Sequence, residues 1–540
     1  MPWLCMYAIG IRPLINTLQE QTDSSKCQQV WYADDSSGAG KLIEIRKWWD
    51  VLNKDGPKYG YFPKPSKTIL IIKNPQDLQM ANELFNGTGI TITLEGERHL
   101  GAVIGSNEFR SRYISTKVGK WIQDVEQLAK IADDEPQLAY SAFTKALSMR
   151  WCFLQRTIPD TKTYFEPLEG TIRDKLIPAI IGRRVTDLER KIISLPVRLG
   201  GMGIQNPTLT ADTEFRNSTI ITQNLTTLIE NQEQNLENYD EERLMSEIKR
   251  MKTEKEEAFM EQLEEIKQVV DLKLCRSIDL ACEKGAGAWL SALPLQSLSY
   301  TLNKQEFRDA ICLRYGWRIT NTPAYCAFGS KNSVDHTLNC KRGGYVNMRH
   351  NNIRDFEATL LKEVCRDVKI EPMLLPVGNS ESRSSNQAER ARLDVSAVGI
   401  WSTMERTFLD VRVMHVNSPS YMDKTPQQIY LQHEREKKYT YNHRILEIEK
   451  GTFTPLVFST TGGMGPECTK YHKRIAELVS VKRDEAYADV MNYIRTRIRF
   501  ALLKSTLIAV RGVRGRSRRG NTSLEDTSLN LVPARETYEV

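Results

Sequence analysis

Two adjacent aspartates, Asp34 and Asp35, follow a short apolar and aromatic run and precede a series of small residues. The run that ends at Tyr32 is typical of a strand, and the small residues fit a tight turn. Both carboxylates are therefore expected at the tip of a hairpin. Converging carboxylates hold divalent ions, which activate a hydroxyl and stabilise a leaving pyrophosphate in nucleotidyl transfer. An ordinary surface turn is the alternative interpretation.

A second pair of acids lies far downstream, where Asp394 opens one predicted strand and Asp410 lies within the next. Strand side chains alternate, so Asp410 and Arg412 should share a face. The arrangement resembles the PD-(D/E)-x-K nuclease core, which implies that both acids bind Mg²⁺ for attack on a phosphodiester. Arg412 occupies the usual lysine position, and an arginine does not deprotonate at cellular pH. The alternative is that both acids cap local structure or pair with local arginines such as Arg392 and Arg412.

A predicted helix after Asp410 carries Lys437 and Lys438. In the restriction-like endonucleases of non-LTR retrotransposons, which this region resembles, the lysine lies on such a helix shortly before a tyrosine. The resemblance therefore assigns the catalytic lysine to Lys437 or Lys438, with Tyr439 or Tyr441 as the tyrosine. Glu357, on an earlier predicted helix, is a candidate for an additional acid near the metals.

Four potential zinc ligands, Cys326, His336, Cys340 and His350, have the spacing C-x9-H-x3-C-x9-H. Zinc needs four nitrogen or sulfur ligands in a tetrahedron. Related knuckles have a second cysteine at the position that Phe328 occupies here. Either His350 supplies the fourth ligand, or the segment holds no metal and is stabilised by packing. With zinc bound, we expect the segment to grip nucleic acid.

The hairpin acids also stand in a wider order of motifs: Y-x-D-D, a helix, G-x6-K-T and L-G-x-x-I-G. This order resembles the palm of reverse transcriptases from non-LTR retrotransposons. The resemblance places Asp34 at a metal-binding position with Asp35 beside it, and Lys67 near the nucleotide triphosphate. It assigns Leu100 and Gly101 to the strand pair that grips the primer end.

Only 33 residues precede Asp34, whereas the family has fingers and another catalytic aspartate on an earlier strand. The aspartate available upstream, Asp23, belongs to a predicted loop. We therefore expect a truncated polymerase region that does not polymerise DNA by itself, or a decayed palm that keeps only its packing. A separate chain could supply the missing fingers.

The net charge is +7, and residues 511–520 hold five arginines, which favours DNA and RNA as partners. A solvated tail is the alternative interpretation of these arginines. The ten cysteines show no disulfide framework, which indicates a reducing compartment. No signal peptide or long apolar run is present, so we expect no membrane partner and an intracellular, nuclear protein.

The expected fold class is a multidomain α+β or α/β chain. Residues 1–115 should mix short strands, at 29–32, 67–73 and 100–106, with turns and a helix at 41–56. The expected domains are a partial palm at 1–115, a thumb-like helical region at 116–225, a charged helical linker at 226–300, a Cys/His knuckle at 301–350, a restriction-like endonuclease at 351–510 and a basic tail at 511–540.

These features together predict a partial retroelement protein. It would combine the truncated polymerase region with an endonuclease that uses Mg²⁺ or Mn²⁺ to nick target DNA, and Zn²⁺ would fill the knuckle. The alternative is a non-catalytic remnant that only binds nucleic acid. A third interpretation is a fragment that never folds completely, because half a palm exposes apolar strand edges.

Overall fold

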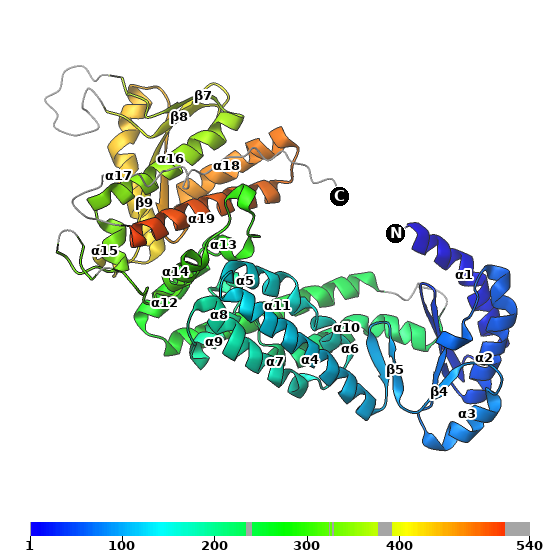
Figure 1. Ribbon diagram of the computed structural model, residues 1–540. Coiled ribbons are helices and arrows are strands. Elements are labelled where there is room, and N and C mark those ends of the chain that lie inside the picture. Colours follow the sequence, from blue (N-terminus) through cyan, green and yellow to red (C-terminus); the bar gives the residue numbers. More distant parts are fainter. Residues whose placement is uncertain (1, 234–239, 323, 327–328, 376–390, 513–540) are drawn as a thin grey trace. The chain divides into compact units, whose positions relative to one another are not determined.

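The computed structural model describes residues 2–512 except 234–239, 323, 327–328 and 376–390. The described chain is mixed α+β, mostly helical with small sheets (Figure 1). It forms two compact units. The first unit contains Met1–Gln127, Lys145–Asp174 and Asn206–Ala258, and the second contains Leu128–Thr144, Lys175–Gln205 and Phe259–Val540.

The units do not follow the predicted domain boundaries. The predicted helical region at 116–225 is divided between the two units. The predicted knuckle at 301–350 and endonuclease at 351–510 belong to one unit. Most of the predicted basic tail, from residue 513 onwards, lies outside the described residues.

The first unit begins with helix α1 (Pro2–Gln21), which our expectation of short strands and turns at 1–115 missed. Gly10 and Pro13 lie inside this helix and hide it in the sequence, because both residue types usually interrupt helices. Its buried residues Ile11, Leu14 and Leu18 nevertheless recur at helical spacing. Their packing into the core of the unit stabilises the helix despite the proline.

The predicted strands and helix of residues 27–106 are confirmed, although the strands are short. β1 (Cys27–Tyr32) and β2 (Asp35–Gly40) form an antiparallel hairpin, followed by α2 (Leu42–Asp55). β3 (Ile69–Ile71) pairs in parallel with β4 (Thr91–Thr93), and β5 (Gly96–His99) pairs in antiparallel with β6 (Ala102–Gly105). Ile45, Trp48 and Leu52 of α2 are buried in the core that also takes in α1.

Helices dominate residues 107–269, as the sequence predicts. They are α4 (Asn107–Ala132), α5 (Pro136–Lys145), α6 (Cys152–Thr157), α7 (Glu166–Thr171), α8 (Ile177–Ile181), α9 (Asp187–Ser194), α10 (Pro207–Glu230) and α11 (Glu241–Val269), with the short α3 (Leu78–Leu84) before them. The expected long charged helix is α11, which buries Met251, Leu263 and Ile266. Among the described helices, none is both long and apolar enough to cross a membrane.

The second unit is built around one four-stranded sheet with the order β10-β9-β8-β7. Its elements from residue 272 onwards are α12 (Leu272–Cys282), α13 (Ala288–Ser291), α14 (Lys304–Tyr315), α15 (Val334–Asn339), α16 (Tyr345–Val364), β7 (Arg366–Ile370), β8 (Val395–Val398), β9 (Arg406–Met414), α17 (Pro426–Glu447), β10 (Thr452–Ser459), α18 (Pro466–Arg483) and α19 (Tyr487–Arg511). β10 runs parallel to β9, whereas β9 and β8, and β8 and β7, are antiparallel.

Helices pack on the sheet through two sets of apolar side chains. One core joins α16, α18 and α19 to the strands and includes Leu409 and Val411 of β9. A separate cluster joins α17 to the sheet and includes Phe408 of β9 and Ile445 of α17. This alternation follows from the two-residue period of a strand. It turns the even-numbered residues of β9, including Asp410, towards α17.

Candidate functional site

The acids predicted for the nuclease lie across from each other on adjacent strands. The antiparallel register of β8 and β9 pairs Val395 with Leu409, and the amide of Asp394 donates to the carbonyl of Leu409 at 3.2 Å. Extending this register by one residue sets Asp394 opposite Asp410. Directly opposed residues point to the same face of a sheet, so the two carboxylates are neighbours.

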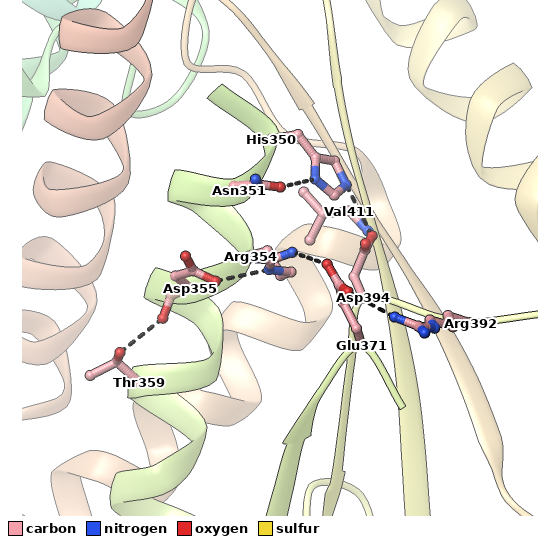
Figure 2. Close-up of polar contacts among 9 residues, drawn as sticks. All are labelled: His350, Asn351, Arg354, Asp355, Thr359, Glu371, Arg392, Asp394 and Val411. Atoms are coloured by element: carbon pink, nitrogen blue, oxygen red, sulfur yellow. Dashed lines mark hydrogen bonds and ion pairs between the residues drawn. The ribbon is translucent and has the colours of Figure 1, made fainter. Parts of the chain in front are cut away.

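Two donors hold one carboxylate oxygen of Asp394. Oδ2 accepts a hydrogen bond from the backbone amide of Val411 at 2.6 Å and another from Nε2 of His350 at 3.1 Å (Figure 2). Within the described chain, no hydrogen bond or ion pair reaches Oδ1 of Asp394. The carboxylate is thus fixed through one oxygen, while the other can accept a ligand.

Asp410 is almost completely buried beneath α17. Burial raises the pKa of its carboxyl group, and nearby Asp394 raises it further, while the ammonium of Lys437 opposes that rise. Lys437 forms an ion pair with Oδ2 of Asp410. Among the described residues, this oxygen has no hydrogen-bond partner with suitable geometry. A carboxylate beside a second carboxylate offers the oxygen ligands that a hard cation prefers.

The two adjacent lysines of α17 have different partners. Lys437 faces Asp410, and its Nζ lies 5.7 Å from the centre of the Tyr441 ring. Lys438 instead pairs with Glu467 of α18 at 2.7 Å. Tyr439 is 93% exposed. Of the combinations that the sequence left open, the geometry brings Lys437 and Tyr441 to the acids.

The arginines that could have neutralised the two acids are engaged elsewhere. Nη1 of Arg412 lies 3.3 Å from Glu436 of α17, and Arg392 lies 3.4 Å from Glu371. Arg354, one turn after His350 on α16, also binds Glu371, with 2.5 Å between Nη1 and Oε1 (Figure 2). The interpretation of Asp394 and Asp410 as partners of Arg392 and Arg412 is therefore wrong.

Glu357, the candidate for an additional acid, is buried in the core. Its Oε1 lies 2.9 Å from Nε2 of His472 on α18. Nδ1 of that histidine donates to the carbonyl of Cys468 at 2.8 Å. Glu357 thus pairs with His472, and it has no hydrogen bond or ion pair with Asp394 or Asp410 in the described part of the chain.

Three of the four predicted zinc ligands come together. The ligand atoms of Cys326, His336 and Cys340 all lie within 4.8 Å of one another. Ser333 caps α15 by accepting from the amide of His336, and Cys340 follows the last turn of that helix. The thiols and imidazole match the ligands that zinc prefers. The position of Phe328 lies outside the described residues.

The predicted fourth zinc ligand, His350, instead belongs to the site formed by Asp394, Asp410 and Lys437, called the acidic site below. Its Nε2 faces Asp394, and its Nδ1 lies 3.4 Å from Oδ1 of Asn351. Both ring nitrogens are therefore engaged away from the cysteines. Sequence spacing could not reveal this, because His350 lies on α16, whose direction depends on how that helix packs against the sheet.

The segment that carries Cys326, His336 and Cys340 contacts elements of the acidic site. Asp335 of α15 accepts from Nε2 of His415, just beyond the end of β9, at 2.7 Å. Arg349 of α16 donates to the carbonyl of Leu338 in α15 at 3.3 Å. The position of α15 is thus tied to the strand that carries Asp410 and to the helix that carries His350.

In the first unit, Asp34 and Asp35 lie at the turn of the β1–β2 hairpin, as predicted. Tyr32 pairs with Asp35, so Ala33 and Asp34 form a two-residue turn, and both aspartates are exposed. Ala33 has a φ of 53°, a left-handed conformation.

The remaining residues predicted for the polymerase region lie on other turns of the first unit. Leu100 and Gly101 form the turn between β5 and β6, with φ values of 46° and 85°. Lys67 is exposed just before β3. Within the described residues, Lys67 makes no hydrogen bond or ion pair with Asp34 or Asp35.

The side chains and their donor atoms define what the acidic site can hold. It offers carboxylate oxygens from Asp394 and Asp410, a lysine ammonium and a histidine that fixes one carboxylate. Oxygen ligands of this kind suit Mg²⁺ or Mn²⁺. Scans against protein-family models and against curated proteins each found no match to this chain.

Proposed function

We propose that the second unit is a metal-dependent endonuclease that cleaves phosphodiester bonds of DNA. One observation carries this proposal: Asp394 and Asp410 lie opposite each other on adjacent strands, and Lys437 of α17 forms an ion pair with Asp410. Paired carboxylates with a lysine beside them are the groups that in-line hydrolysis of a phosphodiester needs.

The two acids would bind Mg²⁺ or Mn²⁺, which when bound makes water a stronger nucleophile and offsets charge on the phosphate. Oδ1 of Asp394 and the buried carboxylate of Asp410 are the ligand atoms that the geometry offers. The ammonium of Lys437 would donate a hydrogen bond to the attacking water and hold it beside the phosphate. Burial of Asp410 keeps competing bulk water away from this carboxylate.

We further propose that the chain derives from a non-LTR retroelement, with a palm-like segment in the first unit. The β1–β2 hairpin with Asp34 and Asp35 at its tip, and the tight turn at Leu100 and Gly101, support this proposal. Cys326, His336 and Cys340 would hold Zn²⁺ in a knuckle that contacts DNA or RNA. The arginine-rich segment that begins at Arg511 would add electrostatic attraction for the same polyanions.

The test is to incubate the purified full chain with supercoiled plasmid and Mg²⁺. We expect conversion to nicked circles by the wild type, loss of cleavage with a chelator, and loss in Asp410→Ala and Asp394→Asn. Asp489→Asn, which changes an exposed aspartate of α19, is the matched control and should cleave normally. Equal cleavage by the wild type and Asp410→Ala would refute the proposal that this unit is an endonuclease.

The competing function is a nucleic-acid-binding remnant without catalysis. It predicts salt-sensitive binding to any DNA or RNA, unchanged in Asp394→Asn, and no metal-dependent nicking by the wild type. The exposed Lys67 and the hairpin acids Asp34 and Asp35 would then contribute charge only. A filter-binding titration at two salt concentrations, run beside the nicking assay, separates the two functions.

A further inference from the structure

His350 is joined to the acidic site by a contact that its sequence spacing does not suggest. It lies on the second turn of α16, and its Nε2 is 3.1 Å from Oδ2 of Asp394. The amide of Val411, next to Asp410, donates to the same oxygen at 2.6 Å. Both donors bind Oδ2 and none of the described residues binds Oδ1, so the carboxylate has one anchored oxygen and one open oxygen.

The orientation of the His350 ring is itself constrained. Nδ1 lies 3.4 Å from Oδ1 of Asn351, and the side chain is 30% exposed. An Nε2–H group donates to Asp394 in the imidazolium and in one neutral tautomer, so the contact does not depend on the charge of the ring. One turn further along α16, Arg354 is held by Glu371, whose amide donates to the carbonyl of Asp394 at 2.9 Å.

We propose that His350 is a positioning residue for Asp394 and presents its Oδ1 to the divalent metal. This inference rests on the proposed nuclease function and deepens it, because it assigns a residue that holds a ligand rather than binding the metal. A carboxylate without the histidine could rotate about its Cβ–Cγ bond, while the single bond from Val411 remained. Partners that orient a metal ligand typically change affinity by about 10–100-fold.

The experiment measures Mn²⁺ binding to the full chain by electron paramagnetic resonance. Stoichiometric Zn²⁺ is present to occupy Cys326, His336 and Cys340, the Cys/His group. His350→Ala should weaken Mn²⁺ binding about 10-fold. His350→Gln should restore affinity to near that of the wild type, because the glutamine amide can place an N–H donor where Nε2 lies. His443→Ala, an exposed histidine of α17, should bind Mn²⁺ like the wild type.

The outcomes separate this inference from the function beneath it. Wild-type affinity in His350→Ala, with binding lost in Asp410→Ala, would overturn the role of His350 and leave the metal site standing. Equal weakening in His350→Gln and His350→Ala would also overturn it, because the donor would then be irrelevant. Absence of Mn²⁺ binding by the wild type would overturn both proposals. Thermal melts of each variant establish that the second unit stays folded.

Discussion

Lys437 pairs with the buried carboxylate of Asp410, whereas the next residue along the helix, Lys438, reaches Glu467 on another helix. Successive residues on a helix point about 100° apart, so only one of two neighbouring lysines can face the acids. The sequence could not choose between them, since both precede a tyrosine at a suitable distance. The packing of α17 on the sheet makes the choice.

Lys437→Ala should therefore lower plasmid nicking by about 100-fold, the usual cost of losing a group that stabilises charge in a transition state. Lys438→Ala removes a partly exposed ion pair, so its effect should stay below about 5-fold. Initial rates of nicking at saturating Mg²⁺ provide the measurement. A larger loss of nicking in Lys438→Ala than in Lys437→Ala would show that Lys438, and not Lys437, has the catalytic role.

The Cys/His group gives a prediction about metal content. Cys340→Ser should lose bound zinc, measured by mass spectrometry of the purified chain, because zinc sites need each thiolate. His350→Ala should retain the zinc of the wild type, since both ring nitrogens face away from the cysteines. Cys365→Ser is the control for loss of a thiol outside the group. Loss of zinc in His350→Ala would restore the four-ligand set predicted from the spacing.

Glu434 provides a test of pH dependence. It lies buried on α17 and accepts from the amide of Glu467 at 2.9 Å, at the start of α18. Burial raises its pKa to about 7, although the amides of Glu467 and Cys468 both donate to the carboxylate and lower it. An acid with a raised pKa in the folded state binds more protons there than in the unfolded chain, so stability falls as pH rises from about 4.5 to about 7.

Glu434→Gln keeps the accepting oxygen but removes the ionisation. Its melting temperature should exceed that of the wild type by about 3 °C at pH 8 and match it near pH 5, where Glu434 is protonated. Differential scanning calorimetry at both values provides the measurement. An equal difference at the two pH values would mean that the charge on Glu434 is not the cause.

Helix α1 yields a stability prediction for the first unit. Leu14 is completely buried, so Leu14→Ala should cost about 2–5 kcal/mol of unfolding free energy. Ile9, on the same helix, is 70% exposed, and Ile9→Ala should change stability by less than about 0.5 kcal/mol. Urea unfolding followed by circular dichroism distinguishes the two. Similar effects would contradict the packing of α1 against α2.

The sequence predicted elements well where the pattern was local. The strand carrying Asp410, the helix carrying Lys437 and the hairpin holding Asp34 all showed clear periodicity or turn chemistry. It failed where tertiary packing decides. α1 contains Pro13 and was missed, and β7 has a short, mostly exposed sequence that gives no apolar alternation.

The candidate site was predictable in its acids and not in its supports. Asp394 and Asp410 stand in an order that a strand pair explains, so their meeting could be anticipated. His350 was assigned to zinc because spacing places it near Cys340 along the chain, but spacing says nothing of which way a helix side chain points. Arg354 and Glu371 carried no signal, since their roles arise only where α16 meets the strands.

The contact between Glu357 and His472 affects how α16 is oriented, and not the chemistry of the site directly. His350, Arg354 and Glu357 stand four and three residues apart, so they share one side of α16. A shift of the helix by a single residue would rotate that side by about 100° and separate Glu357 from His472. The buried Glu357–His472 pair thereby helps to fix the rotation of α16 about its own axis. That rotation sets the direction of the His350 side chain, which lies two turns before Glu357.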